Sequence, residues 1–153
     1  MVPHISRTYA PIGQTPVITI STEISARLYM ASAISPDGDL IYMVRNKPFN
    51  SEAITEFLEL LLHHLQKILI IWDNASIHNS KVTRAWLAQA SYNERLFLVQ
   101  QPKYSPEVNA DEQVWSYLKT VELKNTCNQN VKELKLKIIR AMEKMKSNPE
   151  LIQ

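Results

Sequence analysis

The feature that most restricts how this chain can fold is an uninterrupted apolar run, Ile68 to Trp72 (ILIIW), which stops abruptly at Asp73-Asn74. Such a run predicts a β-strand that is covered on both faces, as the inner strands of α/β sheets are. Polar side chains follow at once, up to His78. Because functional groups in open α/β sheets collect where strands end, this junction is a candidate site.

The segments before this strand predict a β-hairpin and a helix. Residues 27–35 and 39–45 are β-prone and are joined by Pro36-Asp37-Gly38-Asp39, in which proline presets φ and glycine accepts positive φ. A helix capped by Asn50 or Ser51 follows, because apolar residues recur there at helical spacing. These residues are Ile54, Phe57, Leu58, Leu61, Leu62 and Leu65. Residues 15–21 are also β-prone, whereas residues 1–14 show no periodicity.

The segments after the strand complete an alternating pattern. We expect a short helix capped by Asn79 or Ser80, a strand over 95–99, a helix over about 109–123 and a last helix over 130–146. The order hairpin, helix, strand, helix, strand, helix, helix predicts a single α/β domain with a mixed sheet.

Composition excludes several classes of protein. Two glycines among 153 residues cannot build a Gly-rich phosphate loop, so no nucleotide cofactor is expected. The single Cys127 excludes an internal disulfide and a cysteine-based zinc cluster, and it favours a cytoplasmic location. No apolar run approaches the ~20 residues that span a membrane, and the start carries no signal-peptide pattern. A net charge of +2 permits nucleic-acid binding without requiring it.

Two acidic positions each allow two interpretations. Asp73 either begins a turn that caps the next helix or is a functional group at a strand end. Glu112 follows Asn109 at the spacing of a capping box, and a carboxylate there also suits the helix dipole, so spacing alone favours a cap. The same spacing at Asn130 and Glu133 predicts a cap and nothing more.

Two stretches taken together, ILIIWDNASIHNS and QPKYSPEVNADEQVWSYLK, resemble the mariner-like superfamily of DDE transposases, especially its bacterial insertion-sequence branch. In that family an apolar strand ends in Asp-Asn with a His soon after, and a later Pro-x-Tyr-Ser-Pro-x-x-Asn-x-x-Glu-x-x-Trp motif supplies the last acidic residue. The matching positions here are Asp73, Asn74, His78, Pro102, Tyr104, Ser105, Pro106, Asn109, Glu112 and Trp115. Ala110 replaces the family's usual proline, and Gln101-Pro102-Lys103 replaces Leu-Pro-Pro.

The resemblance implies an RNase H-like fold, in which helices flank a mixed sheet, and transfer of phosphodiesters in the DNA of transposon ends. Two divalent ions, Mg²⁺ or Mn²⁺, would be held by three carboxylates, with Asp73 and Glu112 as the catalytic and metal-binding candidates. The supporting candidates are Asn74, His78, Asn109 and Lys119. The candidates for DNA contact are Lys103, Lys119, Lys132, Lys135 and Arg140, although a solvated face also explains the basic last helix. In a bacterial host the protein would be associated with the nucleoid.

The family's first catalytic aspartate lies on a strand ahead of a linker, and residues 7–16 (RTYAPIGQTP) resemble that linker. Asp37 and Asp39 cannot replace it, because they lie in the hairpin turn. We therefore expect a truncated catalytic domain that binds metal weakly and cleaves DNA poorly alone. A missing N-terminal segment or a full-length transposase is the expected partner.

The absent strand is central in the family's sheet, so we expect a gap between residues 27–35 and 67–72. Either residues 15–21 fill this gap, or the two halves close up, or the chain is marginally folded. Two other functions are open: a non-catalytic module that binds DNA or a transposase, and an unrelated α/β phosphotransferase that uses Asp73 as its nucleophile.

Overall fold

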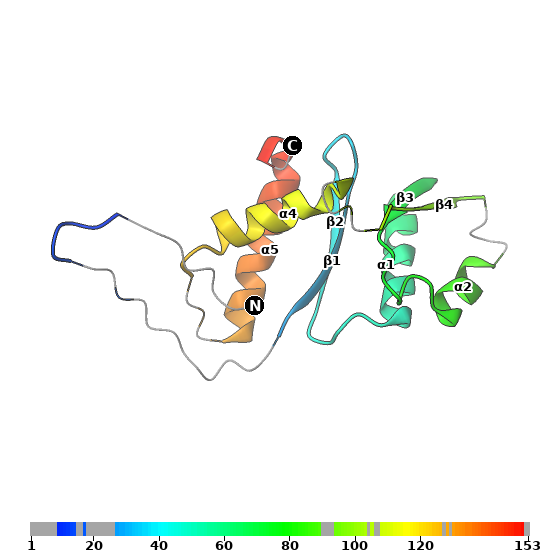
Figure 1. The fold of residues 1–153 in the computed structure, drawn as a ribbon, viewed down its shortest axis with the longest axis horizontal. Helices are drawn as coiled ribbons and strands as arrows, with labels where there is room; N and C mark the ends of the chain where they lie inside the picture. Colours follow the sequence, from blue (N-terminus) through cyan, green and yellow to red (C-terminus); the bar gives the residue numbers. More distant parts are fainter. Residues whose placement is uncertain are drawn as a thin grey trace.

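The computed structural model describes residues 9–14, 17, 27–89, 94–103, 105, 108–126, 128 and 130–151. Its elements follow the predicted order (Figure 1). They are β1 (Tyr29–Ile34), β2 (Leu40–Arg45), α1 (Ser51–His64), β3 (Ile68–Trp72), α2 (Lys81–Leu87), β4 (Leu96–Gln100), α4 (Asp111–Tyr117), the π-helical turn η2 (Leu118–Glu122), α5 (Val131–Ser147) and the 3₁₀ turn η3 (Pro149–Leu151). The possible strand over residues 15–21 lies outside the described residues, apart from Val17.

The predicted hairpin is confirmed. β1 and β2 pair in antiparallel fashion, with Tyr29 opposite Arg45 and Ile34 opposite Leu40. At the turn Gly38 has a φ of +89° and donates its N–H to the carbonyl of Ser35 at 3.0 Å. A side chain at Gly38 would also meet Pro149, 2.4 Å from the position of an added Cβ. Glycine is therefore required at this turn for both conformation and space.

The strands form two separate two-stranded sheets. β3 and β4 pair in parallel, with Ile68 opposite Leu96 and Trp72 opposite Gln100, and neither strand pairs with β1 or β2. Among the described strands, β1 and β3 each have a partner on one side only. The two halves have thus not closed up by pairing β1 with β3, which was one of the three expected outcomes.

Helix α1 connects the two sheets on one face. Its buried side chains, such as Leu58 and Leu61, form a core cluster whose partly buried members come from the hairpin and from β3 and β4. A second cluster lies on the opposite face of the hairpin, where α4, η2 and α5 pack. In Figure 1 these helices stand on one side of β1–β2 and α1 on the other.

The expectation that β3 is covered on both faces is wrong. Ile68, Ile70 and Trp72 pack toward α1, whereas the alternate side chains of β3 and β4 are between 43% and 62% exposed. These exposed residues are Leu69, Ile71, Phe97 and Val99. The physical reason is that successive side chains point to opposite faces of a strand, and α4 and α5 pack against the hairpin instead of this pair of strands.

The predicted caps are mostly confirmed. The side chain of Asn50 accepts the N–H of Ala53 at α1, Ser80 accepts that of Thr83 at α2, and Asn130 accepts that of Glu133 at α5. The helix expected over 109–123 is shorter, because α4 begins at Asp111 and gives way at Leu118 to a π-helical turn.

Candidate functional site

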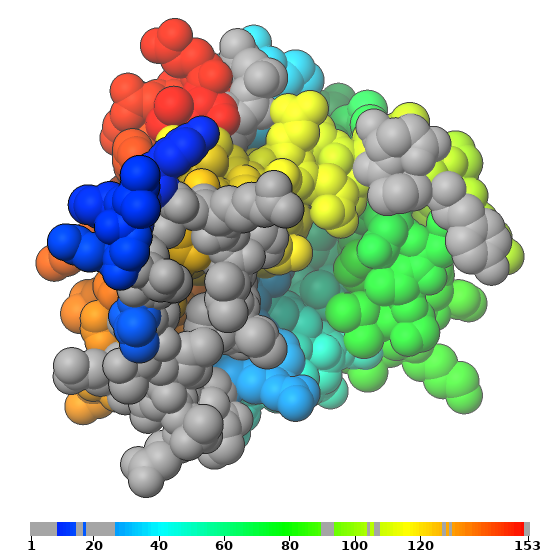
Figure 2. Space-filling view, turned by 60° about the vertical axis from the view of Figure 1, so that its left-hand side comes forward, coloured from blue at the N-terminus to red at the C-terminus, as the bar shows by residue number. Residues whose placement is uncertain are grey.

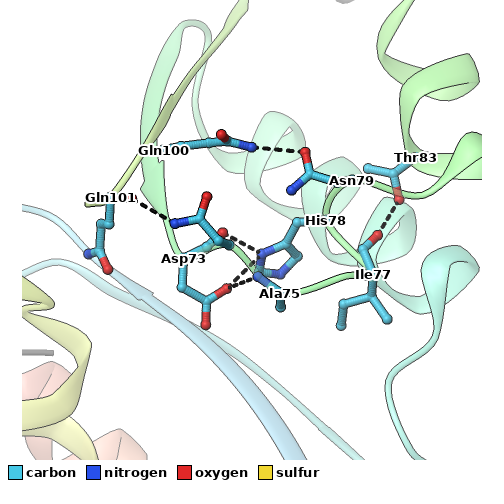
Figure 3. A network of polar contacts seen from close by, with 9 residues as sticks. Asp73, Ala75, Ile77, His78, Asn79, Thr83, Gln100 and Gln101 are labelled. Carbon is cyan, nitrogen blue, oxygen red and sulfur yellow. Dashed lines mark hydrogen bonds and ion pairs between the residues drawn. The ribbon is translucent and has the colours of Figure 1, made fainter. Parts of the chain in front are cut away.

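Asp73 follows the last residue of β3, and, among the described residues, neighbouring groups contact only one of its two carboxylate oxygens, Oδ1. The backbone N–H of Ala75 donates to Oδ1 at 2.9 Å, and His78 Nδ1 lies 3.0 Å from the same atom (Figure 3). The first contact is an Asx turn, so the turn interpretation is correct for this oxygen. The side chain is nevertheless 60% exposed, and no described residue forms a hydrogen bond or ion pair with Oδ2. One oxygen thus orients the carboxylate and the other stays available.

His78 is itself fixed in place. Its ring stacks on Trp72 with centroids 4.5 Å apart and an interplanar angle of 4°, and its Nδ1 also lies 3.2 Å from the carbonyl oxygen of Asp73. The segment that carries His78 is tied to α2, because Thr83 donates its hydroxyl to the carbonyl of Ile77 at 2.8 Å. The strand end and the helix start together determine where the imidazole stands beside Asp73.

A cavity of about 430 Å³ opens where β3 and β4 end. Its lining residues are Asp73, Asn74, Gln101, Pro102, Lys103, Ser105, Asn109 and Glu112. Parallel pairing brings the two strand ends to one edge, and Asn74 Nδ2 reinforces this by donating to the Gln101 carbonyl at 2.7 Å. Figure 2 shows the α4 segment (yellow) next to the region of β3 and α2 (green). The two candidate carboxylates therefore border one space.

Glu112 lies in the first turn of α4 and is exposed. The side chain of Asn109 accepts the backbone N–H of Asp111 at 3.1 Å, and no side chain caps α4 in the manner of a capping box. The capping-box interpretation of Asn109 and Glu112 is therefore wrong, because α4 begins one residue later than that motif requires, with Ala110 as its N-cap.

The residue before Glu112 forms a network that the sequence analysis missed. Asp111 Oδ2 accepts the hydroxyl of Ser32 at 2.9 Å and the indole N–H of Trp115 at 2.8 Å. Burial raises the pKa of the Asp111 carboxyl, and the two hydrogen bonds oppose that shift. Asp111 Oδ1 is buried and has no hydrogen-bond partner among the described residues. The contact between Asp111 and Trp115 could have been predicted from the sequence, because the two residues are one helical turn apart. The contact with Ser32 on β1 could not, because no local pattern indicates it.

A family model described as "DDE superfamily endonuclease" matches residues 2–135. The chain belongs to this family. It is 30% identical over 106 residues to the "Insertion element IS630 uncharacterized 39 kDa protein" of Shigella sonnei, an alignment that covers 65% of this chain and 30% of that protein. This alignment makes the chain similar to an insertion-element protein, of which it covers less than a third.

The fold of this DDE chain matches that of the Mos1 mariner transposase. The Mos1 paired-end complex with Mn aligns with a TM-score of 0.65 at 14% identity, over 98% of this chain and 50% of that one. The Mos1 strand transfer complex aligns with a TM-score of 0.62, over 96% of this chain and 49% of that one. The RNase H-like α/β fold is thereby confirmed. The chain spans about half the length of these solved chains.

Most of the remaining candidates do not line the cavity. Lys119 is exposed on η2 and is not among the lining residues. On α5, Lys132 and Arg140 are exposed and Lys135 is half-buried. Of the five residues proposed to contact DNA, Lys103 alone lines the cavity. No helix in the described part of the chain has the length and apolar character needed to cross a membrane.

The donor groups around the cavity suit a hard divalent cation. Asp73 and Glu112 offer carboxylate oxygens, which Mg²⁺ and Mn²⁺ prefer, and the Asn74 amide is anchored by its nitrogen. DDE transposases in general use divalent metal ions. Within the described ranges, however, no group of three or more His, Cys, Asp or Glu side chains converges as a metal site. The residues present therefore fit part of such a site.

Proposed function

We propose that this chain supplies Asp73 and Glu112 to the metal site of a DDE transposase that cuts and joins DNA at transposon ends. The observation that supports this most strongly is that both residues line one cavity, although they lie on elements of different core clusters. Membership of the DDE endonuclease family indicates the class of reaction, and the cavity is where we propose that it takes place.

In this proposal the chain's own residues orient ligands and substrate. Asp73 would present Oδ2 to a cation while Ala75 and His78 hold Oδ1. Two bound ions would polarise the attacking water or 3′-hydroxyl and stabilise the departing oxygen of the phosphodiester. Lys103, exposed at the same cavity, would attract the phosphate through its charge.

We also propose that the 153-residue chain alone is catalytically incomplete. A two-ion site needs more carboxylate oxygens than Asp73 and Glu112 provide, and the described residues add no third acidic ligand there. Among the described strands β1 and β3 each pair on one side only, which supports a partner that enters as an extended strand. Such a segment, from elsewhere in a transposase, would bring the additional carboxylate.

DNA is the proposed macromolecular partner. One Mos1 structure that shares this fold is a paired-end complex with the left transposon end. Lys119, Lys132 and Arg140 are exposed, which leaves them available to phosphates. The alternative of a non-catalytic module, which pairs with a transposase, is supported by the same edges of β1 and β3, which have no partner among the described strands. Family membership removes the basis for the phosphotransferase alternative.

The metal site is tested by Mn²⁺ titration of the ¹⁵N-labelled chain. Paramagnetic broadening of the side-chain amide signals of Asn74 and Asn109 is expected, and Asp73→Asn and Glu112→Gln should each weaken it by about tenfold or more. Glu52→Gln is the matched control for Glu112, since Glu52 is another first-turn glutamate. Unselective broadening, or broadening that survives both substitutions, would contradict the site.

Catalytic incompleteness is tested by cleavage of DNA carrying terminal inverted repeats, in Mg²⁺ or Mn²⁺. The 153-residue chain should cleave little, and a transposase segment supplied in trans should increase cleavage in an Asp73-dependent way. Asp37→Asn, in the hairpin turn, is the control. Robust cleavage by the chain alone that disappears in Asp73→Asn would refute incompleteness while supporting the site.

A further inference from the structure

We propose that Asp111 is a positioning residue, and that its hydrogen bond to Ser32 of β1 sets where the neighbouring Glu112 stands relative to Asp73. This inference rests on the proposed metal site. It adds two residues, Asp111 and Ser32, that would act on that site without lining the cavity.

Such a contact is needed because the two carboxylates of the proposed site are carried by elements that pack in different core clusters. Glu112 belongs to α4, whose buried Val114 is part of the core cluster on one face of the hairpin. Asp73 follows β3, which packs in the cluster on the other face. The distance between the two carboxylates thus depends on how α4 sits against the hairpin. Apolar contacts such as those of Val114 hold a helix near a sheet but are not directional.

The hydrogen bond from Ser32 is directional and lies next to the ligand. Ser32 donates to Asp111 Oδ2 across 79 residues of sequence, and Asp111 is the residue immediately before Glu112. Trp115, one turn further along α4, donates to the same oxygen at 2.8 Å and so fixes the Asp111 side chain from within the helix. The first turn of α4 is therefore tied to β1 at one defined point.

The cost of this arrangement favours a role beyond packing. Asp111 is half-buried, and its Oδ1 is buried with no hydrogen-bond partner among the described residues. A buried polar atom without a partner destabilises the fold, and an apolar side chain of similar size would avoid that cost. In some proteins a buried polar group is retained despite its destabilising effect because it specifies one geometry.

The test uses the Mn²⁺ titration of the 153-residue chain with three serine variants. Ser32→Ala removes the donor and should weaken Mn²⁺ binding at Asn74 and Asn109 by about tenfold, the usual effect of losing a group that orients a ligand. Ser32→Thr keeps a hydroxyl and should restore most of the affinity. Ser116→Ala, at an exposed position on α4, is the control and should change nothing.

Urea unfolding of the same variants separates positioning from stability. Asp111→Asn keeps an oxygen that can accept from Ser32, so its affinity should lie closer to that of the wild type than that of Asp111→Ala. Unchanged Mn²⁺ affinity in folded Ser32→Ala, with only a lower unfolding midpoint, would overturn the inference. An equal loss of Mn²⁺ affinity in Ser32→Ala and Ser116→Ala would overturn it as well.

The two proposals fail differently. If the wild-type chain shows no selective Mn²⁺ broadening, the metal site itself is wrong, and the inference falls with it. If Asp73→Asn abolishes broadening while Ser32→Ala leaves it intact, the metal site stands and the positioning role is refuted.

Discussion

The exposed face of β3 leads to a quantitative prediction about two leucines. Leu69 points away from α1 and is 62% exposed, whereas Leu58 of α1 is 2% exposed within the core cluster. Replacing each by alanine removes the same atoms from very different surroundings. The two variants therefore compare the open face of the strand pair with its covered face.

The expected magnitudes follow from these exposures. Full burial of a leucine stabilises by about 1.5–3 kcal/mol, and Leu69 is 38% buried (100 − 62), so Leu69→Ala should lower the free energy of unfolding by ~0.6–1.1 kcal/mol. The lower β-propensity of alanine adds a few tenths of a kcal/mol. Leu58→Ala leaves a cavity in the core and should cost ~2–5 kcal/mol.

Urea denaturation of the 153-residue chain, followed by far-ultraviolet circular dichroism at two protein concentrations, measures both values. A cost for Leu69→Ala equal to that of Leu58→Ala would refute the reasoning, because it would mean that something covers the outer face of β3. A cost that appears only at the higher concentration would identify that cover as a second copy of the chain.

Three further predictions concern the site, a helix cap and DNA. His78→Phe should keep the stacking on Trp72 but lose the contact with Asp73, so Mn²⁺ affinity should fall about tenfold. Its free energy of unfolding should change by less than ~1 kcal/mol, since the lost contact involves an exposed carboxylate; a larger loss would mean that His78 is chiefly structural. Asn50→Ala should destabilise the chain by ~1 kcal/mol in urea unfolding, because the cap of α1 is lost, and no change would show that Asn50 contributes no cap. Charge reversal on α5 should lower DNA affinity and flatten its salt dependence in a fluorescence-anisotropy titration. Lys47→Glu is the control. An unchanged salt dependence would mean that the basic side chains of α5 form a solvated face that does not contact DNA. The residues to reverse are Lys132, Lys135 and Arg140.

Local patterns in the sequence were sufficient to predict most elements. The hairpin turn at Gly38, the caps at Asn50 and Asn130 and the strand over Ile68–Trp72 all depend on neighbouring residues, and the structure confirms them. Asp73 and Glu112 were also identified from the sequence, through the resemblance to a family whose membership is now shown. Their roles as metal ligands stay predictions.

Other features depended on the arrangement of elements in space. An apolar run is the same whether one or both faces of its strand are covered, so the exposure of Leu69 was decided by where α4 and α5 pack. The spacing of Asn109 and Glu112 fits a capping box, but the actual start of α4 at Asp111 excluded it.

The sequence by itself determined the order of strands and helices, because turn chemistry, capping and hydrophobic periodicity act between residues a few positions apart. Only the tertiary structure decided that Asp73 and Glu112 border one cavity and that Ser32 donates to Asp111. The physical reason is that such contacts join residues far apart in the chain, and their formation depends on how two core clusters pack on opposite faces of one hairpin.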